Sequence, residues 1–201
     1  MVEEQRLDLK NGIMITQFDI DKLLKKGVID SELELEQAFS VDKKLRLLSK
    51  KDASFIIKRK KLRTLIENYE KQNWSKESNI TDKTLCESDI AEEIAGKESF
   101  FIAQRKEVIR KKLKDFNLNQ QQLGEILGHS SKSYMSELMN GICPFSMRDL
   151  VIIHRILEIE LKDLIPTTIP HQDRIQIKSS LMRLRNTKVR LSKKALEEIH
   201  I

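Results

Sequence analysis

The segment from residue 118 to 141 restricts the fold more than any other part of the chain, because it predicts two short helices around a tight turn. Asn119 and Gln122 have the spacing of a capping box, which begins a helix. The apolar residues that follow have the i, i+3, i+4 spacing of one buried helical stripe: Leu123, Ile126 and Leu127. Gly128 then ends the helix, because glycine easily adopts the left-handed backbone that often follows a last helical turn.

A second helix is predicted directly after this turn. Ser131 can cap it, and Asn140 with Gly141 can end it. Its apolar residues repeat the same stripe: Met135, Leu138 and Met139. Two short helices joined in this way form a helix-turn-helix, whose second helix has the right width for the major groove of DNA.

The polar residues of the second helix favour a DNA-binding role. They avoid the apolar stripe and crowd toward the amino-terminal half, which reaches base edges in such motifs: Ser131, Lys132, Ser133, Ser136 and Glu137. The amino terminus of a helix also carries unpaired N–H groups and a partial positive charge that suit phosphate. The alternative is an ordinary helical hairpin with a solvated polar face.

The helices predicted on either side of this pair favour the DNA-binding role over the ordinary helical hairpin. A helix over 105–116 precedes the helix-turn-helix, Ser146 can cap a fourth helix, and a short fifth helix over 159–165 ends at Pro166. Five helices in this order, with the reading pair second and third, match the layout of phage-repressor-like domains. We therefore expect an all-α chain with such a domain at 100–166.

A smaller helical region is predicted before this domain, over residues 1–74. Its first 30 residues allow either a short strand at 13–16 or a short helix that ends at Gly27. Ser31 and Glu34 then form a second capping box at the start of a clearer helix.

Two more helices are predicted within this region, a short one at 45–48 and a long one at 52–73. The long helix has an apolar stripe of its own: Leu62, Leu65, Ile66 and Tyr69. The segment from 41 to 63 is dense in Lys and Arg, which indicates either a second nucleic-acid contact or a solvated helix face. The sequence does not decide between these two interpretations.

Two further segments differ in the sign of their charge. Residues 75–99 are acidic and poor in apolar side chains, so they are predicted to be a linker with one helical turn near 90–94. Residues 167–201 begin with prolines and then become basic, which predicts a carboxy-terminal extension that either docks or stays disordered.

Composition excludes several classes of protein. The net charge is +6 with 34% charged residues, which favours an anionic partner, and no apolar run reaches the roughly 20 residues of a membrane span. Two cysteines without CxxC spacing indicate free thiols and a cytoplasmic location. The four histidines lack metal-ligand spacing, and no phosphate-binding loop or catalytic triad pattern is present. We therefore expect no enzyme activity, cofactor or metal.

Two segments resemble HigA-type antitoxins, the partners of RelE-fold toxins that carry an XRE-like helix-turn-helix. SSKSYMSELMNGICPFSMRDLVIIHRILEIELKDLIP, at 130–166, resembles their DNA-binding half, and LRTLIENYEKQNW, at 62–74, resembles the segment that precedes it. Ile142 and Cys143 stand where the family usually has Lys or Arg, and the amino-terminal region is basic where the family is often acidic.

This resemblance implies specific roles for residues. Base-reading positions fall on Lys132, Ser133, Ser136 and Glu137, and Gln120 falls on a position that fastens a phosphate and braces the reading helix. Ser131 and Asn140 complete the predicted DNA-binding set. The toxin would contact the stripe of the 52–73 helix, which consists of Leu62, Leu65, Ile66 and Tyr69.

The implied function is that of a homodimeric antitoxin that neutralises a RelE-like toxin and represses its own operon by binding operator DNA. Two alternatives stay open. One is a stand-alone repressor of the same fold without a toxin partner. The other is an interaction adaptor that has lost DNA binding, which would account for the missing basic residue after Asn140 and Gly141.

Overall fold

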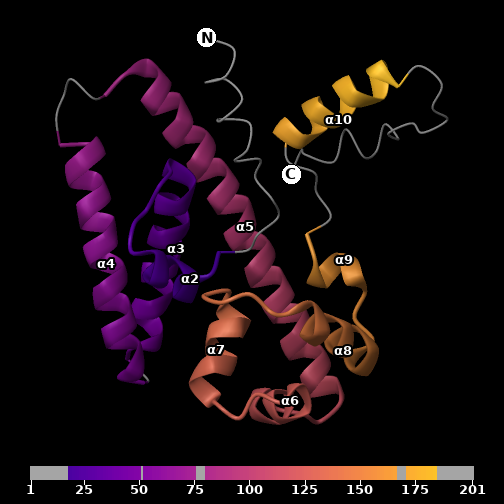
Figure 1. Ribbon diagram of the computed structural model, residues 1–201. Helices are drawn as coiled ribbons and strands as arrows, with labels where there is room; N and C mark the ends of the chain where they lie inside the picture. Colours follow the sequence, from indigo (N-terminus) through magenta and orange to yellow (C-terminus); the bar gives the residue numbers. More distant parts are fainter. Residues whose placement is uncertain (1–17, 51, 76–79, 167–170, 185–201) are drawn as a thin grey trace. The chain divides into compact units, whose positions relative to one another are not determined.

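The computed structural model describes residues 18–50, 52–75, 80–166 and 171–184, and all regular secondary structure in this part of the chain is helical (Figure 1). This confirms the all-α prediction for the described residues. Residues 17–164 form one compact unit. A second unit contains residues 1–16 and 165–201, and its described helix is α10 (His171–Arg183). The strand alternative at 13–16 lies outside the described residues.

The first unit begins with the short helix α2 (Ile20–Lys26). The Asp19 side chain accepts hydrogen bonds from the backbone N–H groups of Asp21 and Lys22, which caps the helix. Gly27 ends it with a φ of +78°, a left-handed backbone that glycine adopts without strain. The short-helix alternative ending at Gly27 is therefore confirmed.

Helix α3 (Glu32–Leu48) is one continuous helix, although the sequence predicts a break before residue 45. Ser31 caps it by accepting a hydrogen bond from the Glu34 N–H at 3.2 Å, as the capping box predicts. The buried stripe continues without interruption through Ala38, Val41 and Leu45. The predicted short helix at 45–48 is therefore the last turn of α3.

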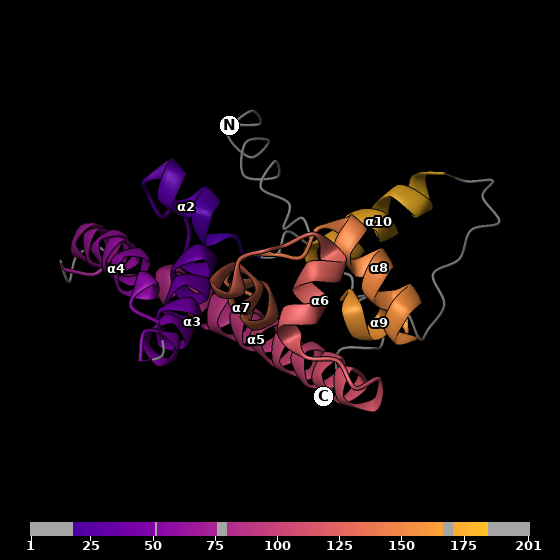
Figure 2. The ribbon, with the colours of Figure 1, turned by 90° about the horizontal axis from the view of Figure 1, so that it is seen from below.

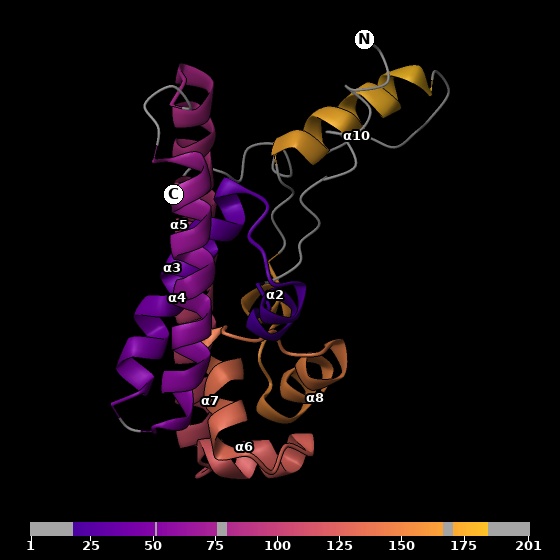
Figure 3. The same ribbon diagram turned by 60° about the vertical axis from the view of Figure 1, so that its left-hand side comes forward.

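Helix α4 (Ser54–Asn73) packs on α3, and Figure 3 shows these two helices beside α5. Arg59 donates two hydrogen bonds to the Asp42 carboxylate at 2.9 and 3.3 Å, which joins the helices near one end. Near the other end, the Tyr69 hydroxyl and the Trp74 indole N–H both donate to Glu32, at 2.8 and 3.2 Å. Paired bonds at both ends fix α4 along α3.

Helix α5 (Asp82–Asp115) corrects the predicted acidic linker at 75–99, since a single helix of 34 residues begins at Asp82. Its amino-terminal half packs on α3 through the small buried residues Ala91 and Ala95, which allow close approach. Gln37 of α3 donates a hydrogen bond to Glu98 at 2.6 Å. The acidic residues that suggested a linker therefore belong to a helix with one narrow buried face.

The carboxy-terminal half of α5 belongs to a second group of helices: α6 (Gln120–Leu127), α7 (Lys132–Asn140), α8 (Met147–Leu157) and α9 (Leu161–Leu164). All four contact α5, and Figure 2 shows them along this part of the helix. Their order is the predicted one, but the predicted first helix at 105–116 is the carboxy-terminal part of α5. Because α5 contributes to both groups, it joins the helices from α2 to α9 into one compact unit.

A buried arginine strengthens the second group. Arg105 of α5 is almost fully enclosed and donates a hydrogen bond to the Leu164 carbonyl at the end of α9, at 3.4 Å. Its guanidinium lies 5.2 Å from the centre of the Phe145 ring, within the range of a cation–π contact. Burial lowers the pKa of Arg105 to about 10. None of the described helices is long and apolar enough to span a membrane.

Candidate nucleic-acid interface

Helices α6 and α7 have the caps that the sequence predicts. Asn119 and Gln122 form a complete capping box on α6, and Ser131 caps α7 by accepting from the Tyr134 N–H at 3.2 Å. Gly128 ends α6 with a φ of +83°. Gly124 lets the turn fold closely against α6, because a Cβ at this position would lie 2.9 Å from the His129 carbonyl oxygen. The turn between α6 and α7 is therefore set by local sequence.

One face of α7 carries Lys132, Ser136 and Asn140, which are spaced one helical turn apart. Gln120 at the start of α6 donates a hydrogen bond to the Ser136 hydroxyl at 3.3 Å, which braces the two helices as expected. Lys106 of α5 donates to the Asn140 side-chain oxygen at 2.7 Å. Four of the seven predicted DNA-binding residues therefore lie together.

This face borders a hollow of about 430 Å³ between α3, α5, α6 and α7. Four cationic residues line it: Lys44, Lys106, Arg110 and Lys132. Its remaining polar lining is made of amides and a hydroxyl, and no carboxylate lines it among the described residues. The hollow therefore presents positive charge and hydrogen-bond donors, which suits an anion.

Lys44 is a cation of the hollow whose pKa is strongly perturbed. Burial is the largest influence that lowers its pKa to about 8, and the charges of Lys106 and Arg105 lower it further. Glu98 acts in the opposite direction without cancelling these effects. An anion in the hollow would relieve this repulsion and favour the charged form of Lys44.

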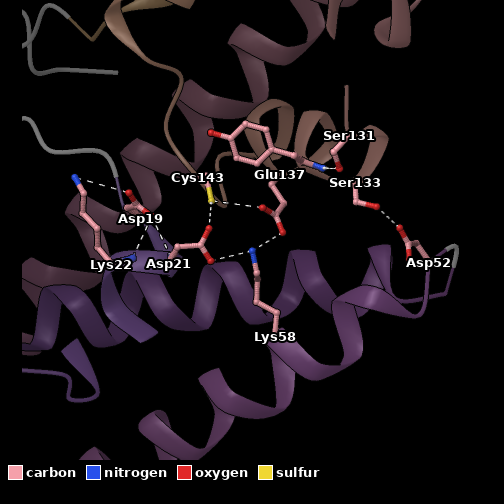
Figure 4. A network of polar contacts seen from close by, with 10 residues as sticks. Asp19, Asp21, Lys22, Asp52, Lys58, Ser131, Ser133, Glu137 and Cys143 are labelled. Atoms are coloured by element: carbon pink, nitrogen blue, oxygen red, sulfur yellow. Dashed lines mark hydrogen bonds and ion pairs between the residues drawn. The ribbon is translucent and has the colours of Figure 1, made fainter. Parts of the chain in front are cut away.

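Glu137 is placed differently from the prediction. Only 6% of it is exposed, and its carboxylate accepts a hydrogen bond from the Lys58 ammonium of α4 at 2.7 Å (Figure 4). Lys58 also pairs with Asp21 at 3.0 Å, and the Cys143 thiol lies 3.4 Å from Asp21 and 3.6 Å from Glu137. Glu137 thus holds α7 against α2 and α4, and its carboxylate is engaged inside the protein and not on the exposed face of α7.

Ser133 and Ser131 also have structural partners. The Ser133 hydroxyl donates a short hydrogen bond to the Asp52 carboxylate, which lies just before α4 (Figure 4). This bond, with those from Ser54, lowers the pKa of Asp52. Ser131 is occupied as the cap of α7. Of the predicted residues, Ser131, Ser133 and Glu137 therefore have structural partners on other sides of α7, whereas Lys132, Ser136 and Asn140 border the hollow.

Sequence reasoning missed Lys44, Lys106 and Arg110 as members of the site. Lys44 lies in the basic 41–63 segment that suggested a second nucleic-acid contact, but nothing in that segment distinguishes it from its neighbours. Lys106 and Arg110 are one turn apart on α5, a spacing that is common on solvated helices. Only the packing of α3 beside α5 brings the three together.

The predicted toxin-binding stripe is mostly an internal contact. Leu62 and Ile66 are buried, Leu65 is half-buried, and Tyr69 donates its hydroxyl to Glu32. These residues hold α4 on α3, so they do not form an exposed surface in this conformation. The large exposed apolar residues of α4 are instead Ile56 and Ile57, which are 54% and 66% exposed.

One group of potential metal ligands occurs among the described residues. Atoms of Asp19, Asp21 and Cys143 lie within 4.8 Å of one another. All three take part in other contacts: Asp19 caps α2, Asp21 pairs with Lys58, and the Cys143 thiol contacts Asp21 and Glu137. Burial, with the nearby carboxylates, raises the pKa of Cys143, which keeps the thiol protonated. These contacts account for the group as part of the α2–α7 interface.

No family model, curated protein or solved structure matches the chain. The resemblance to HigA-type antitoxins therefore stays a prediction.

Proposed function

We propose that this chain is a sequence-specific DNA-binding regulator that reads the major groove with α7. One observation carries the proposal. Gln120, Lys132, Ser136 and Asn140 converge on a cationic hollow that no described carboxylate lines. Amides, hydroxyls and ammonium groups are the donors that contact phosphates and base edges in protein–DNA complexes.

The chemistry of these side chains fits a reading role. An ammonium such as that of Lys132 can donate to guanine O6 or N7, and the amides of Gln120 and Asn140 can donate to phosphate or pair with adenine. A single helix of nine residues contacts too few bases for useful specificity. We therefore expect a homodimer on a palindromic site, with the two reading helices about 34 Å apart.

The test is selection of binding sites from a random duplex library, followed by fluorescence anisotropy titrations of the selected site. Lys132→Ala should weaken binding to the selected site by about 1–3 kcal/mol, while binding to random duplex changes less. Lys83→Ala is the matched control, because Lys83 is an exposed lysine at the far end of α5. A wild-type chain that enriches no sequence would contradict the proposal.

A second candidate function is toxin neutralisation, the role that the family resemblance implies. It is favoured by the exposed pair Ile56 and Ile57, because adjacent large apolar side chains on a helix surface are typical of protein–protein contacts. The partner would be a small RelE-like protein encoded next to this chain.

Co-expression with the neighbouring reading frame separates the two functions. Replacing both Ile56 and Ile57 with Asp should abolish growth rescue and leave operator binding intact. Lys132→Ala should have the opposite effect. If the double variant rescues growth as well as the wild type, these residues are not the toxin contact.

A further inference from the structure

We propose that the cationic hollow is a docking site for a backbone phosphate of the same DNA, with Lys44, Lys106 and Arg110 as its ligands. This inference rests on the proposed function and extends it. The three residues lie outside the helix-turn-helix, on α3 and α5. The amino-terminal region would then belong to the DNA interface and would not be a separate module.

The positions of the cations support one shared ligand. Lys106 donates to Asn140 of α7 at 2.7 Å, so its ammonium lies directly beside the reading helix. Arg110 follows one turn later on α5 and lines the same hollow. Lys44 belongs to α3, which packs along α5, and it lines the hollow from that helix. Cations from two helices therefore meet at the edge of the surface that would face a duplex.

The lining of the hollow is positive, and nearby carboxylates offset only part of this charge. Three carboxylates lie near its cations: Glu98 accepts from Gln37, Asp52 accepts from Ser133, and Glu107 forms an ion pair with Arg110 at 3.3 Å, which partly neutralises that cation. None of the three lines the hollow. Lys44 is partly buried among these cations, so a bound phosphate would favour its charged form.

The pKa of Lys44 agrees with this view. It is lowered to about 8 by burial and by the charges of Lys106 and Arg105. A cation held partly buried among other cations weakens the fold, and such conflicts are typical of binding sites. The hollow, at about 430 Å³, has room for a phosphodiester with part of its sugars.

The first experiment measures how salt affects binding. Lys44→Met and Lys106→Met are compared with Lys83→Met, each with the selected site and with random duplex. Both hollow variants should weaken binding to the two DNAs alike, by about five- to ten-fold at moderate salt, and should reduce the log–log salt slope by about one. Lys83→Met should leave affinity and slope unchanged.

A thermal melt of each variant excludes a merely structural role. Lys44→Met should melt at the same temperature as the wild type or higher, because it removes an unfavourable buried charge. A loss of DNA affinity without a loss of stability identifies a ligand. If the wild type binds DNA and both hollow variants keep its salt slope, this inference is wrong while the proposed function stands. If the wild type binds no DNA, the proposed function fails first.

A second experiment distinguishes DNA from a free phosphorylated molecule, which offers the same chemistry. Calorimetric titrations of inorganic phosphate and of a nucleoside triphosphate into the full chain without DNA should show no binding below the millimolar range. Submillimolar binding of the triphosphate that Lys44→Met abolishes, together with an unchanged DNA salt slope, would overturn the assignment in favour of a small-molecule site.

Discussion

The Lys58 ammonium lies 2.7 Å from the buried carboxylate of Glu137, and the two residues are 79 positions apart in the chain. This ion pair joins α4 to the candidate reading helix α7. It fixes which face of α7 is covered, because Glu137 points to α4 while Lys132 and Ser136 border the cationic hollow.

Breaking this pair should destabilise the protein. Lys58→Met leaves the Glu137 charge buried without its closest cation, so we expect the free energy of unfolding to fall by about 2–4 kcal/mol. The double variant Lys58→Met/Glu137→Met should recover much of the loss, since no buried charge remains. Urea unfolding of the four proteins in the cycle measures the coupling, and strictly additive effects would contradict it.

The Lys44 ammonium should make DNA affinity depend on pH. Its pKa of about 8 means that the side chain loses its charge between pH 7 and 9, so binding should weaken over this range. The charged groups that act on it are Lys106, Arg105 and Glu98, and the pKa of Arg105, about 10, lies above this range. Lys44→Arg is the matched control, because a guanidinium stays charged. Equal pH profiles for the two proteins would remove Lys44 from the interface.

Lys44 should also make the stability of the fold depend on pH. Stability should rise with pH, whereas DNA affinity should fall. The pKa of Lys44 is lower in the folded chain than its ordinary value of 10.5, so the charged form opposes folding. This penalty is fully present below pH 8 and disappears as pH rises toward 10.5. Lys44→Met should therefore stabilise the chain by about 1–3 kcal/mol at pH 7 and by much less at pH 10. Denaturant titrations at both pH values give the comparison.

Replacing Gly96 and Gly141 with alanine should change the stability of the fold in opposite directions. Gly96 is exposed within α5, and a Cβ there meets no atom within 4 Å, so Gly96→Ala should stabilise by about 0.5–1 kcal/mol through helix propensity. Gly141 has a φ of +64°, and a Cβ would lie 2.6 Å from Ile102, so Gly141→Ala should destabilise by at least about 1 kcal/mol. Thermal melts check both. A destabilised Gly96→Ala chain would argue against a continuous α5.

The fold was most predictable where short-range chemistry determines it. The caps Asn119, Ser131 and Ser146 and the stop at Gly128 define α6, α7 and the start of α8 as the sequence predicts. Each of these signals acts within a few residues, so no knowledge of tertiary contacts is needed. Even here a spacing can mislead: Ile126 fits the buried stripe of α6 but is 39% exposed.

The errors arose where distant parts of the chain decide the outcome. The amino-terminal half of α5 has few apolar residues, but Ala91 and Ala95 suffice for a buried face because α3 packs on them. Sequence reasoning places Glu137 on the solvent side because its partner, Lys58, lies far away in sequence. The cationic hollow depends on the same kind of information, since Lys44 and Lys106 meet only through the packing of α3 and α5.

Helix α5 has a mechanical consequence for the whole of residues 18–164. At 34 residues it is about 51 Å long, and its two halves lie in different packing groups. A cut between residues 99 and 100 would sever the helix and would strip the group that contains α7 of its Lys58 and Asp52 contacts. The two groups should therefore melt in one cooperative transition, and the amide hydrogens in the packed parts of both halves of α5 should exchange at similar rates. A partner that strains α3 or α4 would therefore also displace α7, because the three helices are joined through α5 and the Lys58–Glu137 pair.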